Sequence, residues 1–158
     1  TGNATEGWGA LTQNGLDGWN APNLVDSNIA TDSFSTDTSA VGSYMAIDYG
    51  ADNETALISW SYYVDGAVTA IWDIQHSADN ITWETSYTGF DCSGGAGWKT
   101  VAWTNTGGYR YWRSYKTNAA ALGQYHSELS VTALRRTPVT ITGVTSNEYI
   151  VRVTIGEY

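Results

Sequence analysis

The chain has 158 residues, with 16 Asp and Glu residues against 7 Lys and Arg residues and a formal net charge of −9 at pH 7. This length suits one domain with its own hydrophobic core, and no segment is apolar for long enough to predict membrane insertion. The negative charge excludes a nucleic-acid binder, because such a protein needs surplus cations to displace the counterions of phosphate.

The first part of the chain shows no hydrophobic periodicity. Residues 1–22 mix Gly, Asn and Thr, which predicts an irregular N-terminal arm. Residues 23–39 are rich in Asp, Asn, Ser and Thr, which predicts a long loop. Oxygen-bearing side chains are dense in this loop, so it can hold a ligand.

Short apolar segments separated by turn signals follow, a pattern typical of an all-β sandwich or barrel. Eight Trp and eleven Tyr residues also favour extended structure over helix. In one segment Ile58, Trp60, Tyr62 and Val64 share a face at period two, which predicts that this face lies in the core. The expected strands cover residues 44–49, 56–64, 68–76, 81–87, 99–104, 109–117 and 128–134.

The strand expected over residues 109–117 contains three of the seven cations of the chain. Alternation places Arg113 on one face, with three tyrosines, and Arg110 on the other face. A buried guanidinium needs a carboxylate, and Asp48 and Asp73 are the candidate partners. We therefore expect structural ion pairs and packed aromatic rings in this strand, and we do not expect it to bind nucleic acid.

The last part of the chain, residues 137–158, is expected to be a C-terminal β extension. Its two predicted strands cover residues 139–142 and 149–155. They either close the sandwich or form an arm that pairs with the sheet edge of a neighbouring chain.

Five motifs follow one another in a fixed order. They are NLVDSNIATD (23–32), YMAIDYG (44–50), IQHSADNITWET (74–85), YRYWRSY (109–115) and SELSV (127–131). Their order resembles that of discoidin, or coagulation-factor C, domains and of the carbohydrate-binding modules that share their galactose-binding-like fold. Ser27 and Asn80 stand where glycine is usual in that group. The resemblance implies a galactose-binding-like (discoidin, jelly-roll) β-sandwich of about eight strands over residues 23–136.

The resemblance also implies a metal site. The family often holds a structural calcium ion in the loop that Asp26, Asn28 and Thr31 occupy here, and Glu128 from the last strand of the sandwich is expected to meet them. Calcium takes six to eight oxygen ligands, which an irregular loop supplies readily. The alternative is that these side chains only cap turns through local hydrogen bonds.

Glycan binding is the function that the resemblance implies. Modules of this kind stack loop aromatics on the apolar face of a sugar ring and take its hydroxyl groups with polar side chains. The glycine-rich segment FDCSGGAGW (90–98) is the best candidate loop, because its glycines let Trp98 project. The expected ligand-binding residues are Trp98, Asp91 and Trp103. The alternative is that Trp98 folds back over the core.

Catalysis is not expected. The chain has two histidines, and DCSGG lacks the context of a serine protease active site. The carboxylates are scattered, with no pair that can be placed across a cleft.

We therefore expect a non-catalytic protein that binds a glycan or another cell-surface ligand. Because segments outside the sandwich are predicted at both ends, the preferred hypothesis is a structural component of a virion, either a capsid decoration or a tail protein. Its terminal arms would contact other subunits and it would lie on the virion surface. The alternative is a carbohydrate-binding module of a secreted, extracellular carbohydrate-active or adhesive protein.

Overall fold

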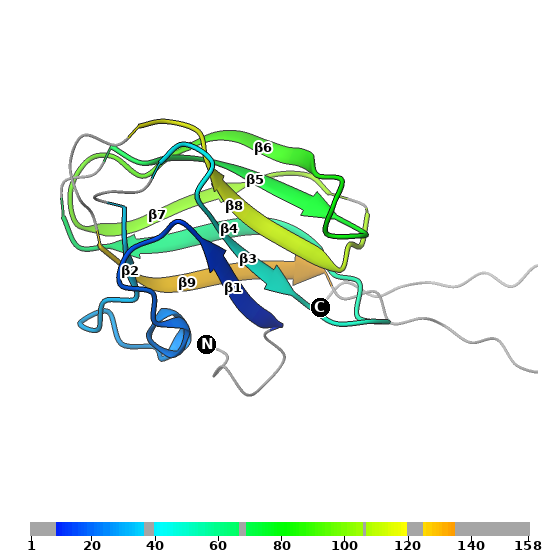
Figure 1. The fold of residues 1–158 in the computed structure, drawn as a ribbon, viewed down its shortest axis with the longest axis horizontal. Coiled ribbons are helices and arrows are strands. Elements are labelled where there is room, and N and C mark those ends of the chain that lie inside the picture. The colour runs from blue at the N-terminus through cyan, green and yellow to red at the C-terminus, as the bar shows by residue number, and fades with distance from the viewer. Residues whose placement is uncertain (1–8, 37–39, 67–68, 106, 120–124, 135–158) are drawn as a thin grey trace, which may run out of the picture.

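The computed structural model describes residues 9–36, 40–66, 69–105, 107–119 and 125–134, and in these ranges it is a sandwich of two antiparallel sheets (Figure 1). One sheet has five strands in the order β1-β3-β8-β5-β6, and the other has four strands in the order β2-β9-β4-β7. The all-β sandwich predicted from the sequence is confirmed. The elements are β1 (Ala10–Asn14), η1 (a 3₁₀ helix, Ala21–Val25), β2 (Phe34–Ser35), β3 (Tyr44–Asp48), β4 (Ala56–Val64), β5 (Ile71–Ser77), β6 (Glu84–Asp91), β7 (Gly97–Ala102), β8 (Tyr111–Lys116) and β9 (Tyr125–Leu134).

The core lies between the sheets and is built from large aromatic side chains. Trp60 and Tyr62 of β4 face Trp72 of β5 and Trp112 of β8, and all four are fully buried. Their polar atoms are partly matched across the core, since Tyr62 Oη lies 2.6 Å from Ser114 Oγ. Burying rings of this size from both sheets supplies most of the hydrophobic stabilisation of the fold.

A β-bulge in β4 changes the predicted core face. The pairing of β4 with β9 shifts between Leu57 and Ser59, so Ile58 is the extra residue on its strand. Leu57 consequently lies in the core, while Ile58 is only half-buried. The prediction was therefore right for Trp60, Tyr62 and Val64 and wrong for Ile58, because strict alternation stops at the bulge.

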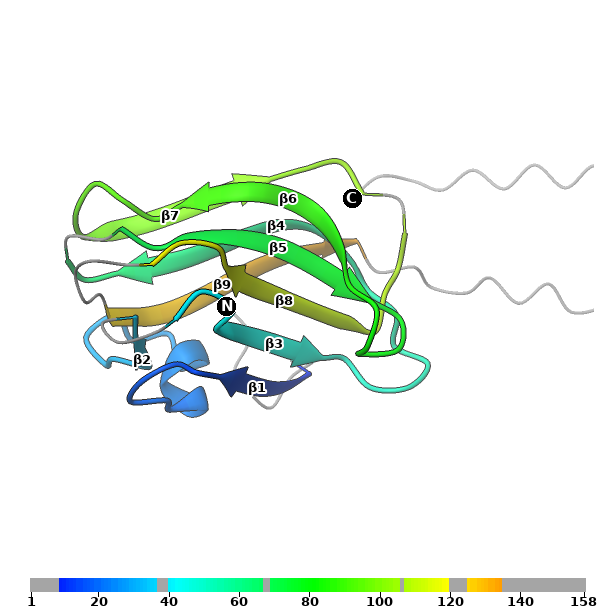
Figure 2. The same ribbon diagram turned by 45° about the horizontal axis from the view of Figure 1, so that its top comes forward.

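The structure extends the sandwich towards the N-terminus. Residues 1–22 were expected to form an irregular arm, but Ala10–Asn14 form β1, the edge strand of the five-stranded sheet, paired antiparallel with β3 (Figure 2). Leu16 is buried and Leu11 packs against the core. The C-terminal extension expected over residues 137–158 lies outside the described residues. No helix in the described ranges reaches the length and apolar character of a membrane span.

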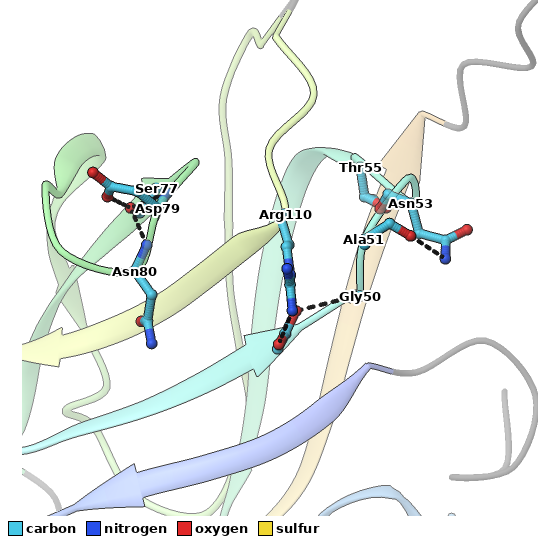
Figure 3. A network of polar contacts seen from close by, with 9 residues as sticks. Gly50, Ala51, Asn53, Thr55, Ser77, Asp79, Asn80 and Arg110 are labelled. Carbon is cyan, nitrogen blue, oxygen red and sulfur yellow. Dashed lines mark hydrogen bonds and ion pairs between the residues drawn. The ribbon is translucent and has the colours of Figure 1, made fainter.

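Strand β8 alternates as predicted. Trp112, Ser114 and Lys116 point inward and are buried, whereas Arg113 is only partly buried on the outer face. Arg110 lies just before the strand and makes a two-pronged ion pair with Asp48, from Nε to Oδ1 at 2.7 Å and from Nη2 to Oδ2 at 2.9 Å (Figure 3). Of the two expected carboxylate partners, Asp48 is therefore the one that pairs with a guanidinium.

Candidate functional site

The loop after η1 brings together the four residues expected to bind metal. Asp26 Oδ1 and Glu128 Oε1 both accept a hydrogen bond from the Asn28 backbone N–H, at 2.8 and 2.7 Å. The Thr31 hydroxyl donates to Asp26 Oδ2 at 2.8 Å. Ser27 turns the chain with φ of 64°, in the left-handed region that favours glycine. The loop and β9 thus place two carboxylates side by side, although they are far apart in sequence.

The pKa values of the Asp26 and Glu128 carboxyl groups reflect their closeness and their burial. Burial and the neighbouring Asp26 carboxylate raise the pKa of Glu128 to about 7. Although burial opposes it, the hydrogen bonds from Thr31 and Asn28 lower the pKa of Asp26 below its ordinary value. One carboxylate of the pair is therefore held as an anion at neutral pH, and the second is close to its titration midpoint.

The chemistry of this donor set fits a hard divalent cation. Two carboxylates, an amide and a hydroxyl are all oxygen donors of the kind that calcium takes, and backbone carbonyls and water can complete the shell. In the described ranges no group of three or more His, Cys, Asp and Glu side chains gathers in a way that could hold a metal ion. A metal in this loop would therefore rely on two acidic ligands and several neutral oxygens.

The hairpin between β6 and β7 places Asp91 and Trp98 at the same end of the sandwich. Asp91 ends β6, and its Oδ1 accepts a hydrogen bond from Ser93 N at 2.8 Å. Gly94 and Gly95 follow with φ of 96° and 84°, which turns the chain back into β7. Cys92 is buried under the turn, so the loop is anchored to the core.

Trp98 lies on the outer face of the four-stranded sheet. Its side chain is 49% exposed and is not part of the core, so it does not fold back over the core as the alternative supposed. The indole packs edge-to-face against Tyr63, with ring centroids 5.7 Å apart. In the sheet register Tyr63 lies between Trp98 of β7 and Glu128 of β9. The candidate metal ligands and the exposed indole are thus separated by a single strand, roughly 10 Å between backbones.

A row of small hydroxyl side chains continues from this aromatic pair along the same face. Ser61 of β4 is paired in register with Thr100 of β7 on one side and Ser130 of β9 on the other. The Thr100 hydroxyl donates to Ser61 Oγ at 2.9 Å. The face therefore places an exposed indole next to the exposed hydroxyl group of Thr100, and an indole ring can pack against the apolar face of a sugar.

Trp103 does not join Trp98. It follows the opposite end of β7, is only partly exposed, and packs against the core, with its ring centroid 6.0 Å from that of Trp112 and 6.3 Å from that of Tyr87. Tyr63, which takes the place beside Trp98, is not among the ligand-binding residues expected from the sequence. Its position next to Tyr62 in an alternating strand was the signal, because only one of two adjacent tyrosines can face the core.

The polar residues at the opposite end of the sandwich have structural roles. The β5–β6 turn is held by Asp79, whose Oδ1 accepts hydrogen bonds from the backbone N–H groups of Ile81 and Thr82 at 2.9 and 2.8 Å. Asn80 occupies the turn with φ of 61°. Figure 3 shows this turn beside the Arg110 ion pair. These contacts satisfy the polar groups at the turn and at the strand ends.

No family model and no curated protein matches the chain. Solved structures do. The CBM32 of AlyQ in complex with 4,5-unsaturated mannuronic acid aligns with a TM-score of 0.63 at 19% identity, covering 78% of this chain and 93% of that chain. CpGH89CBM32-5 from Clostridium perfringens, in complex with GalNAc-β-1,3-galactose, aligns at 0.59 and 12% identity, covering 77% and 93%. A truncated AlyQ with CBM32 and alginate lyase domains aligns at 0.58 and 20% identity, covering 83% of this chain and 34% of that one.

These likenesses show that the fold is the galactose-binding-like β-sandwich found in CBM32 modules. They support the predicted resemblance to the fold of carbohydrate-binding modules. They do not support the narrower resemblance to discoidin domains. All three neighbours contain a CBM32 by name, and the third also contains an alginate lyase domain. They favour the alternative hypothesis, a module of a carbohydrate-active protein, and give no support to the preferred hypothesis of a virion component.

Proposed function

We propose that this chain is a non-catalytic carbohydrate-binding module of an extracellular carbohydrate-active protein, and that it binds glycan where β7 begins. The observation that carries the proposal is the half-exposed indole of Trp98, held by Tyr63 on the outer face of the four-stranded sheet. An exposed indole packed against a second ring offers apolar surface to a ligand, because covering that surface is favoured by the hydrophobic effect.

The neighbouring groups suit a sugar. The apolar face of a pyranose packs on an indole, while the exposed hydroxyl group of Thr100, the next residue of β7 on this face, offers a partner for its hydroxyls. The β6–β7 turn is fixed by Asp91 and by the burial of Cys92, so binding costs little ordering of this loop. The likeness to CBM32 modules supports the same class of ligand.

Calorimetric titration of the protein with a panel of neutral and acidic oligosaccharides tests this proposal. Trp98→Ala should weaken binding about tenfold or more, since stacking on an indole contributes on the order of 1–3 kcal/mol. Trp98→Tyr should keep part of the affinity, because a ring remains. Ile81→Ala is the matched control, since Ile81 is 82% exposed but lies at the other end of the sandwich. Equal affinities of the wild type and Trp98→Ala would refute the site.

Within the same proposal, Asp26, Asn28, Thr31 and Glu128 hold a structural calcium ion. Calcium would fix the loop after η1 and neutralise the paired carboxylates, and it supplies no chemistry beyond that. Binding to the folded state alone adds about 2.7 kcal/mol of stability at a metal concentration of 100 times Kd.

The calcium site is tested by thermal unfolding in calcium and in chelator. Calcium should raise the Tm of the wild type, and Glu128→Gln should lose that rise. Asp79→Asn, a carboxylate in the turn at the opposite end, should keep it. An equal response of the wild type and Glu128→Gln to calcium would show that these residues do not bind the ion.

A further inference from the structure

The outer face of the five-stranded sheet carries a guanidinium enclosed by aromatic rings. The Arg113 Cζ atom lies 4.0 Å from the ring centroid of Trp83, 4.8 Å from that of Tyr115 and 5.3 Å from that of Tyr44. These rings come from three segments, namely the residue before β6, strand β8 and strand β3, so the arrangement is made by the fold and not by one strand. Cation–π contacts of this kind hold a guanidinium in a fixed orientation.

Arg113 lacks the carboxylate that such a charge normally has. In the described ranges its one hydrogen bond runs from Nε to Gln75 Oε1 at 2.7 Å, and no carboxylate oxygen lies within 4.0 Å of it. Arg110 is the internal contrast, because both prongs of its guanidinium engage Asp48 (Figure 3). Burial among the rings lowers the pKa of Arg113, but a guanidinium remains charged at neutral pH.

The carboxylates on the neighbouring strands are used elsewhere. Asp48 is taken by Arg110, and Asp73 accepts a hydrogen bond from Gly89 N at 3.0 Å. The residues opposite Arg113 in register are Ala46 of β3 and Gln75 of β5, neither of which carries charge. Among the described residues the Arg113 guanidinium therefore has no carboxylate partner, and its two terminal nitrogens make no hydrogen bond.

We propose that Arg113, together with Trp83, Tyr44 and Tyr115, binds the carboxylate of a hexuronic acid residue carried on an otherwise neutral glycan. The planar fork of a guanidinium matches a carboxylate with two parallel hydrogen bonds. The surrounding rings offer apolar surface to the sugar that bears it. The overall charge of −9 repels a polyanion, so the site fits one acidic residue among neutral ones.

This site is separate from the one proposed around Trp98, which lies on the outer face of the other sheet. The two proposals therefore fail independently. Weaker binding of neutral sugars by Trp98→Ala tests the site around Trp98. A higher affinity for a glycan that carries a carboxylate than for the same glycan without it tests the site around Arg113.

Calorimetric titration with a matched pair of probes tests the site. One probe is a xylo-oligosaccharide with a single glucuronic acid branch, and the other is the same backbone without the branch. The wild type should bind the acidic probe about tenfold or more tightly, since hydrogen bonds to charged groups are the stronger ones. The methyl ester of the acidic probe should bind like the neutral one. Trp98→Ala should keep the preference for the acid.

Two variants test the residue. Gln75→Glu places a carboxylate opposite Arg113, so the two should pair within the fold and the preference for the acidic probe should disappear. Arg113→Met keeps a long side chain between the rings without charge and should lose the preference in the same way. Thermal unfolding checks that both variants are folded.

A spectroscopic titration of the wild type needs no variant. The side-chain Nε–H resonances of Arg113 and Trp83 should shift with the acidic probe and not with its methyl ester. Equal affinity of the wild type for the acidic and neutral probes would overturn the proposal. So would a preference that survives in folded Arg113→Met, or unshifted Arg113 and Trp83 resonances at saturation.

Discussion

Ser27 holds a backbone conformation that its side chain disfavours. Its φ is 64°, and the residue is exposed, with no side-chain hydrogen bond among the described residues to compensate. The resembled motif has glycine at this position. Replacing Ser27→Gly should therefore stabilise the fold, because glycine reaches the left-handed region without the clash of a Cβ atom.

The size of the effect follows from two opposing contributions. The left-handed conformation costs a non-glycine residue about 1–2 kcal/mol. Glycine gains conformational entropy in the unfolded chain, which offsets about 0.4–1 kcal/mol of that relief. The midpoints of these two ranges leave a net stabilisation of about 0.8 kcal/mol, or roughly 2–3 °C in Tm for a domain of this size. Asn80 has a similar φ of 61°, but Asn tolerates the left-handed region, so Asn80→Gly should change the stability by less.

Urea and thermal unfolding in the presence of chelator measure these differences without interference from metal. Ser27→Ala is the control, since it removes the hydroxyl and keeps the Cβ atom, and it should leave the stability within about 0.5 kcal/mol of the wild type. A stabilisation by Ser27→Ala equal to that by Ser27→Gly would refute the argument from backbone strain. So would a larger gain at Asn80 than at Ser27.

Three further measurements probe the fold. Tyr62→Phe leaves the buried Ser114 hydroxyl without its partner and should cost about 1–3 kcal/mol in urea unfolding, whereas Tyr63→Phe on the outer face should cost less. Burial lowers the pKa of His76 below its ordinary 6.5, so stability should fall as the pH drops through and below that value, and His76→Gln should flatten this part of the profile. Backbone hydrogen bonds lower the pKa of Asp79 to about 2, so its contribution should persist above about pH 4 and disappear towards pH 2, a loss that Asp79→Asn should not show.

The strands from residue 44 onward could be predicted because each buries one alternating face between turn signals. Strand β1 could not, since Leu11 is the only large apolar side chain within Ala10–Asn14 and the strand pairs on one side alone. Strand β2 spans only Phe34–Ser35, too short for any periodicity to show. The bulge at Ile58 could not be predicted from the sequence for a different reason. A bulge is defined by how β4 pairs with β9, and the residues of β4 alone do not specify that pairing.

The candidate metal loop was placed through a resemblance, since no local pattern connects Asp26 with Glu128. Asn28 N and Glu128 Oε1 are 2.7 Å apart across 100 positions of the chain. Trp98 and Trp103 could have been told apart from the sequence, because they lie five positions apart and an odd spacing in a strand means opposite faces. Trp98 at the start of β7 is exposed on the outer face, and Trp103 directly after β7 packs against the core.

Arg113 shows how register can decide whether a charge is structural or available to a ligand. The sequence offers Asp73 on β5 as a partner, but β5 and β8 pair so that Asp73 lies opposite Tyr115 and Gln75 lies opposite Arg113. A shift of two residues would keep every side chain on its face and would place the carboxylate against the guanidinium. The buried faces of Trp72, Ile74 and Trp112 set the observed register, because these side chains must interlock in the core. Packing on the inner face thus leaves the cation unpaired on the outer face.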